Sequence, residues 1–147
     1  MKVEKAIFIS ARPERVWQAW VGEISQWWKR PYFNDAERAT GLLLEPRLGG
    51  RFVELWGEAG EGYLLGQVVE WLPIQSFAFT WTERSWLGIA TMVRVELHPE
   101  PQGTQLILMH GGFDRLSDGT AQRSGYESGW SDLLDMLKTH LEDSSST

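Results

Sequence analysis

One histidine stands where acid–base chemistry could occur. His110 alternates with Leu106 and Leu108, which predicts that it points to the same apolar face of a strand. An imidazole in an apolar cavity could exchange a proton with a bound molecule near neutral pH. A lone histidine on such a face is more often a core residue with its hydrogen bonds satisfied. Because Ile107 and Met109 are apolar too, the alternation does not decide which face of this strand points inward.

Two glutamates could act with this histidine as acid and base. Glu54 alternates with Phe52, and Glu70 alternates with Val68, so either carboxylate could point into an apolar space. Such a carboxyl group would have a raised pKa. An unpaired buried carboxylate is costly, so we expect the opposite faces of these strands to point inward and leave both glutamates in water.

Known catalytic and metal-binding signatures are missing from the sequence. The segment from Gly125 to Gly129 has glutamate where a nucleophile elbow needs serine. The chain contains no cysteine, which excludes disulfides, thiolate nucleophiles and sulfur-bound metals. His98 falls on an exposed face, and His140 has no second ligand at metal spacing nearby. We therefore expect no metal and no cofactor, and we favour a protein without catalytic activity.

Tryptophan is unusually frequent, with nine residues in 147. Periodicity assigns Trp17, Trp20, Trp71 and Trp81 to packing positions, where an indole fills the core. The other five lie on short helices, turns or the last helix, where an indole face could instead line a pocket for a flat or apolar ligand. These five are Trp27, Trp28, Trp56, Trp86 and Trp130.

Alternation and chain breakers indicate which elements carry these residues. The pattern predicts a strand over 3–10, a helix that begins at Pro13 and ends near Gly22, and a second short helix over 23–29. Six further strands are separated by turn residues, which is typical of an antiparallel sheet. We place them near 42–45, 50–56, 62–72, 76–83, 89–98 and 104–111.

The clearest pattern is a long helix over 120–142. Its core-facing stripe comprises Tyr126, Trp130, Leu133, Leu134, Leu137 and Leu141. Gly125 and Gly129 weaken this helix, which indicates close approach of a backbone or a ligand. We expect an α+β fold in one domain over 1–142, with a curved antiparallel sheet of six to seven strands wrapped on this helix and two short helices after the first strand. Residues 143–147 are expected to form a disordered tail.

Charge and hydropathy exclude several classes of partner. The chain has 20 acidic and 14 basic residues and a net charge of −6, and no cluster of basic residues suits nucleic acid or an anionic membrane. No apolar run resembles a signal peptide or a membrane span, so we expect a cytoplasmic protein.

Several motifs occur in the order found in one known superfamily. They are Pro13-x-x-Val16-Trp17-x-Ala19-Trp20, Gly49-Gly50-x-Phe52, Gly66-x-Val68-x-Glu70, Phe79-x-Trp81, Gly103-Thr104-x-Leu106-x-Leu108-x-His110-x-Gly112-Phe113 and Gly129-Trp130-x-x-x-Leu134-x-x-Leu137. The chain resembles the START-like (SRPBCC) superfamily, and within it the branch named after the activator of the heat-shock-protein-90 ATPase. This resemblance implies a helix-grip fold, as in the birch-pollen allergen, with a cavity between the sheet and the last helix. Members of the superfamily bind lipids, sterols or other apolar molecules, some cyclise polyketides, and the eukaryotic activator stimulates the chaperone ATPase.

Our first hypothesis is a protein that binds a small hydrophobic or aromatic molecule in this cavity. The expected lining residues are Trp20, Trp28, Phe52, Trp81, His110, Trp130, Leu134 and Leu137. Phe113 and Leu116, between flexible glycines, could form a gate over the cavity or a plain hydrophobic plug. The alternatives are a cyclase or hydrolase that uses His110 with Glu54 or Glu70, and a module that contacts a chaperone. Edge strands also leave a homodimer open.

Overall fold

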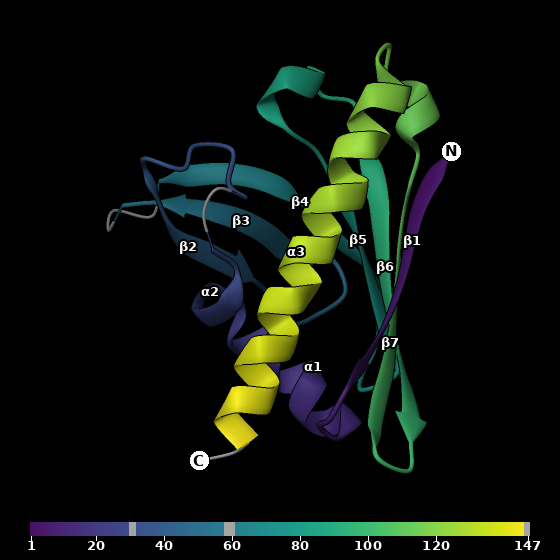
Figure 1. The fold of residues 1–147 in the computed structure, drawn as a ribbon. Coiled ribbons are helices and arrows are strands. Elements are labelled where there is room, and N and C mark those ends of the chain that lie inside the picture. The colour runs from purple at the N-terminus through teal and green to yellow at the C-terminus, as the bar shows by residue number, and fades with distance from the viewer. Residues whose placement is uncertain (30–31, 58–60, 146–147) are drawn as a thin grey trace.

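A curved sheet wraps around one long helix in the computed structural model, which describes residues 1–29, 32–57 and 61–145 (Figure 1). In these residues the elements are β1 (Lys2–Ile9), α1 (Pro13–Gly22), α2 (Ile24–Trp27), β2 (Ala39–Leu44), β3 (Arg51–Trp56), β4 (Gly62–Leu72), β5 (Ser76–Trp81), the 3₁₀ turn η1 (Arg84–Trp86), β6 (Thr91–Glu100), β7 (Gly103–Gly111), the 3₁₀ turn η2 (Phe113–Arg115) and α3 (Gly119–Ser145). The predicted α+β helix-grip fold is confirmed.

The sheet is antiparallel throughout, in the order β1-β7-β6-β5-β4-β3-β2. Val3 of β1 pairs with His110 of β7, so the first strand lies beside the last one. Helix α3 crosses the concave face diagonally (Figure 1). It continues through residues 143–145, which we expected in a disordered tail, whereas 146–147 lie outside the described residues.

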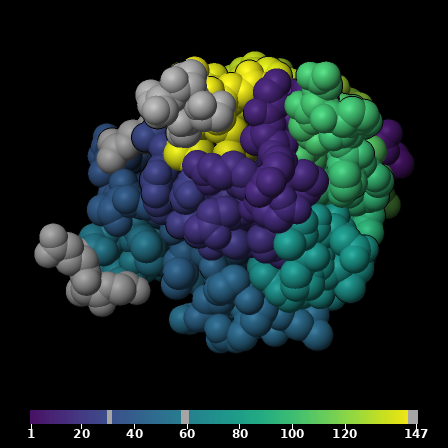
Figure 2. All heavy atoms as spheres, turned by 90° about the horizontal axis from the view of Figure 1, so that it is seen from below, coloured from purple at the N-terminus to yellow at the C-terminus, as the bar shows by residue number. Residues whose placement is uncertain are grey.

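Helices α1 and α2 fill one end of the curved sheet (Figure 2). Pro13 starts α1, where its fixed φ suits a first helical turn. Trp17 and Trp20 of this helix pack against Phe77 of β5, with ring centroids 5.4 and 5.5 Å apart. The Trp27 indole N–H donates a hydrogen bond of 2.9 Å to the carbonyl of Ala19, which joins the two helices. Aromatic packing thus closes this end.

A bulge in β4 changes which of its side chains point inward. Val68 and Glu70 pair with consecutive residues of β5, so Val69 is the extra residue. Val68 and Trp71 pack on the core, whereas Val69 is 45% exposed. The face of β4 opposite Val68 and Glu70, which we expected to point inward, would include Val69 and Trp71. This expectation is wrong for Val69, whereas Trp71 does pack on the core. Glu70 lies on the outer face, where its carboxylate pairs with the Arg94 guanidinium at 3.1 Å.

Gly66 permits a second irregularity in β4. The register between β3 and β4 shifts beside the pair formed by Phe52 and Gly66. A Cβ atom on Gly66 would lie 1.7 Å from the carbonyl oxygen of Thr80, so no larger residue fits without moving the backbone. Phe52 of β3, which pairs with Gly66, is fully buried.

Candidate functional site

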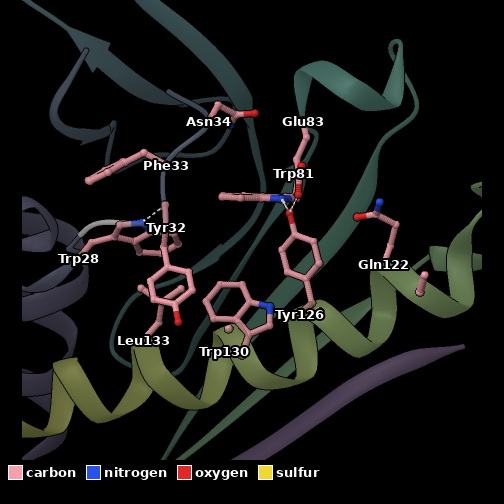
Figure 3. A pocket seen from close by; sticks show the side chains of 13 residues that line it. Trp28, Tyr32, Phe33, Asn34, Trp81, Glu83, Gln122, Tyr126, Trp130 and Leu133 are labelled. Carbon is pink, nitrogen blue, oxygen red and sulfur yellow. Dashed lines mark hydrogen bonds between the residues drawn. The ribbon is translucent and has the colours of Figure 1, made fainter. Parts of the chain in front are cut away.

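A pocket of about 350 Å³ lies along the N-terminal half of α3 (Figure 3). Its other walls are the segment after α2 and the residues at the end of β5. We call it the aromatic pocket, and it is lined by Trp28, Tyr32, Phe33, Asn34, Trp81, Glu83, Ala121, Gln122, Gly125, Tyr126, Gly129, Trp130 and Leu133. Six of these thirteen residues are aromatic, so the walls present mainly ring surfaces.

Three tryptophans from three separate elements form a continuous wall. Trp28 follows α2, Trp81 ends β5, and Trp130 lies on α3. The Trp28 ring centroid lies 6.0 Å from that of Trp81 and 5.8 Å from that of Trp130, and the last two are 6.5 Å apart. These rings are tilted or edge-on to one another, which is the favoured aromatic geometry. Trp28 also donates an indole hydrogen bond of 2.7 Å to the Tyr32 carbonyl and so fixes the segment that forms the opposite wall.

One end of the aromatic pocket is polar. The Trp81 indole N–H donates a 2.7 Å hydrogen bond to the Tyr126 hydroxyl, which in turn donates to the Glu83 carboxylate (Figure 3). Burial, reinforced by the adjacent Glu83 carboxylate, raises the pKa of Tyr126 far above its ordinary value. The hydroxyl therefore stays protonated, and Glu83 brings a negative charge to this end.

His110 lies behind the pocket and holds Trp130 in place. The Trp130 indole N–H donates a 3.0 Å hydrogen bond to His110 Nδ1, so the ring proton resides on Nε2, 2.6 Å from Thr91 Oγ1. Thr91 in turn donates to the Trp81 carbonyl at 3.3 Å. Burial lowers the pKa of His110 to about 3, so the ring is neutral. Both nitrogens serve the core, which makes this histidine a positioning residue for the tryptophan wall.

Glu54 is buried, with 1% of its surface exposed, so our expectation that it lies in water is wrong. Three N–H groups bind its carboxylate: the backbone amides of Asn34 and Asp35 at 2.6 and 2.9 Å, and the Trp56 indole at 2.7 Å. These hydrogen bonds offset the desolvation of the charge. Glu54 thus anchors the segment that carries Phe33 and Asn34 to the aromatic pocket.

The three acid–base candidates do not come together. His110 bonds to Thr91 and Trp130, Glu54 anchors the segment after α2, and Glu70 pairs with Arg94 on the outer face. None of the three lines the aromatic pocket. This arrangement differs from an acid–base pair converging on one ligand, which requires hydrogen-bond reach to a shared molecule.

The expected lining residues divide into two groups. Trp28, Trp81 and Trp130 line the aromatic pocket. The other five lie in the core outside its lining: Trp20, Phe52, His110, Leu134 and Leu137. Of the stripe on α3, only Tyr126, Trp130 and Leu133 line the pocket. The C-terminal part of the stripe is buried, and α3 also contacts α1 and α2.

The two expected gate residues are buried in the core. Phe113 is fully buried, and Leu116 is 8% exposed. The Phe113 ring lies 4.5 Å from the His110 ring and 5.6 Å from the Tyr126 ring, measured between centroids. Neither Phe113 nor Leu116 lines the aromatic pocket. In this conformation the Phe113 ring packs against Tyr126 outside the pocket lining, as a hydrophobic plug would.

Several pocket residues were not predicted from the sequence. They are Tyr32, Phe33, Asn34, Glu83, Gln122 and Tyr126. On α3 the sequence signals for this wall were Gly125 and Gly129, which both line the pocket, and the core-facing stripe, which includes Tyr126. At Gly129 an added Cβ would lie 3.5 Å from the Tyr32 ring, which explains the close approach indicated by that glycine.

The fold and pocket together define a class of protein: a curved antiparallel sheet that grips a long C-terminal helix, as in START-like proteins. A family model described as "Activator of Hsp90 ATPase homolog 1-like protein" matches residues 10–142. The chain belongs to this family.

Solved structures share the fold along nearly the whole chain. A crystal structure of a Mesorhizobium loti protein is 22% identical with a TM-score of 0.70, covering 97% of this chain and 98% of its own. A Nitrosomonas europaea protein is 14% identical with a TM-score of 0.70, covering 100% and 97%. The solution structure of an AHSA1-like protein from Aeromonas hydrophila is 21% identical with a TM-score of 0.68, covering 99% and 94%. No curated protein matches the chain.

None of the helices in the described ranges is both long enough and apolar enough to span a bilayer.

Proposed function

We propose that this protein binds a small, mainly apolar ligand in the aromatic pocket. The observation that carries the proposal is a space of about 350 Å³ between α3 and the end of β5, walled by six aromatic residues. Pockets for small molecules are typically concave, mainly apolar and about 300 Å³ or larger, with a few polar groups. The START-like fold of the family agrees with such a role.

The shape of the walls favours a flat or ring-containing ligand. Trp28, Trp81 and Trp130 offer ring faces and edges at angles that suit offset or edge-on contact with another ring. The Tyr126 hydroxyl and the Glu83 carboxylate lie at one end, where they would bind the polar group of a ligand and fix its orientation.

Gly125 provides a test, because it lines the pocket and has nothing within 4 Å of an added Cβ. In Gly125→Leu the new side chain would occupy the pocket, while Gly125→Ala adds only a methyl group. Both substitutions should strengthen α3 by about 1 kcal/mol, since glycine is a poor helix former. The probe is N-phenyl-1-naphthylamine, a neutral aromatic dye that fluoresces in apolar surroundings.

We expect the wild-type protein and Gly125→Ala to bind the dye and Gly125→Leu to lose binding without losing stability. Fluorescence titration measures the dissociation constants, and thermal unfolding checks the fold. Equal binding by Gly125→Leu and the wild type would place the dye elsewhere and contradict the proposal.

We also propose, second to ligand binding, contact with the heat-shock-protein-90 chaperone, which the description of the family favours. Three apolar side chains of β4 are exposed by 45–49%, namely Leu64, Val69 and Leu72, and would offer an apolar contact surface. The test measures ATP hydrolysis by the purified chaperone with and without this protein. A faster rate that Val69→Asp abolishes would support the contact, and an unchanged rate would refute it.

A further inference from the structure

We infer that the ligand of the aromatic pocket is an organic cation, in which an amine or quaternary ammonium group is carried on an apolar body. The inference rests on the proposed function and adds the chemical class of the ligand. Two independent features carry it: the charge of the pocket lining and the number of aromatic rings around it.

The lining has one charged side chain, and that charge is negative. Glu83 is the only carboxylic acid among the lining residues, and none of them is lysine, arginine or histidine. Within the described part of the chain, no ion pair within 4.0 Å involves the Glu83 carboxylate. The hydrogen bond from the neutral Tyr126 hydroxyl adds no positive charge.

The neighbouring cation is directed elsewhere. Arg84 follows Glu83 in the chain, but its guanidinium donates to the Asn34 carbonyl at 3.2 Å and lies 5.3 Å from the centroid of the Trp56 ring. Arg84 does not line the aromatic pocket. A carboxylate at the edge of an apolar pocket is stabilised by an opposite charge, and a cationic ligand would supply one.

The aromatic walls favour the same charge. The faces of tryptophan, tyrosine and phenylalanine rings carry negative electrostatic potential and attract ammonium groups, and tryptophan does so most strongly. Six such rings line this pocket, and three of them are the mutually packed indoles of Trp28, Trp81 and Trp130. Aromatic cages of this composition recognise quaternary ammonium groups in other proteins.

The charge of the pocket lining disfavours an anionic ligand. A fatty-acid carboxylate would face Glu83 without any lining cation to pair with it. The net charge of −6 for the whole chain also lowers the local concentration of anions and raises that of cations. The site therefore discriminates by charge as well as by shape.

The test compares matched molecules as competitors of N-phenyl-1-naphthylamine. Benzyltrimethylammonium has a neutral isostere, neopentylbenzene, in which carbon replaces the nitrogen, and phenylacetate serves as the anion. We expect the cation to displace the dye at concentrations about tenfold lower than its neutral isostere. Phenylacetate should be the weakest competitor.

Glu83→Gln removes the charge but keeps an acceptor for the Tyr126 hydroxyl. We expect this variant to bind the cation about tenfold more weakly and the neutral isostere unchanged. Glu100→Gln removes the same charge from an exposed position at the end of β6 and should behave like the wild type. If Glu83→Gln does not fold, the comparison of the two isosteres on the wild-type protein decides alone.

The outcomes separate this inference from the proposed function. If neopentylbenzene competes as well as the cation, the ligand class is wrong although the pocket binds ligands. If the cation prevails but Glu83→Gln and Glu100→Gln weaken it equally, Glu83 has no role and the inference is overturned. If neither the dye nor any of the three compounds binds, the proposed function falls together with the inference.

Discussion

Replacing His110 with glutamine should make the fold less sensitive to acid. His110 is fully buried, and its two nitrogens bond to Trp130 and Thr91. Protonation would place a proton on Nδ1, where the ring now accepts the Trp130 hydrogen bond, and would bury a charge. The folded state therefore resists protonation of this histidine, whereas the unfolded chain does not.

The magnitude follows from the two pKa values of this histidine. Its pKa in the folded protein is lowered to about 3, and the ordinary value is about 6.5. Between these values the unfolded state binds more protons, so stability rises with pH. The full contribution is present above about pH 6.5, falls as the pH drops and levels off below about 3. Lowering the pH from 7 to 5 should therefore reduce the free energy of unfolding by about 2 kcal/mol through His110 alone.

Urea denaturation of the wild type and His110→Gln at pH 7 and pH 5 measures this contribution of His110 to the free energy of unfolding. Both proteins share all other titrating groups, so the difference between their losses isolates His110. We expect the wild type to lose about 2 kcal/mol more than the variant. Equal losses would refute a neutral buried imidazole. If the variant does not fold, NMR of the wild-type imidazole decides, because a ring that titrates above pH 5 would refute the argument equally well.

Two further predictions concern buried and half-buried carboxylates. Glu54→Ala leaves three N–H groups without their acceptor and should lower the free energy of unfolding by about 2–4 kcal/mol, whereas Glu70→Ala breaks a half-exposed ion pair worth under about 1 kcal/mol. Similar losses for the two variants in urea denaturation would contradict these assignments. Burial opposes ionisation of Glu23, but hydrogen bonds from His140 and Arg15 outweigh it and lower the pKa of Glu23. The stability from this carboxylate is present above its ordinary pKa and lost as pH falls through the lowered value, so Glu23→Gln should reduce the melting temperature more at pH 7 than at pH 3.

The fold could be predicted because its patterns are local. Alternation along β1 and β6 and the 3.6-residue stripe of α3 each depend on residues close in the sequence. The bulge at Val69 is different, because its position depends on how β4 pairs with β5. The sequence of β4 alone does not determine this pairing. The prediction for Val69 failed for that reason.

The site could be predicted only in part. Trp28 and Trp130 stood out because an indole on a short helix or on the last helix suits a pocket. Trp81 was among the expected lining residues, although periodicity assigned it to a packing position. The contact of Tyr126 with Glu83 joins residues 43 apart, from α3 and the loop after β5, and no spacing marks it. The burial of Glu54 was missed because two of its three N–H donors are the backbone amides of Asn34 and Asp35, which any residue except proline would supply.

His110 is a core residue with satisfied hydrogen bonds, which is the more common role of a lone histidine on an apolar face. From the sequence, a catalytic imidazole and a satisfied core residue were both open. The hydrogen bonds to Trp130 and Thr91 occupy both ring nitrogens, and burial keeps the ring neutral. In this structure its contribution to a site is therefore indirect, through the orientation of one pocket wall.

The most direct test of ligand binding in the aromatic pocket follows the indole N–H signals of the nine tryptophans by NMR. N-phenyl-1-naphthylamine is titrated into ¹⁵N-labelled protein, and the signals are assigned by substitution. We predict that Trp28, Trp81 and Trp130 shift with one common dissociation constant. Trp17 and Trp71, which pack against each other at 5.0 Å outside the pocket, should not move. Shifts confined to Trp17 and Trp71, or no shifts at saturating dye, would contradict the account.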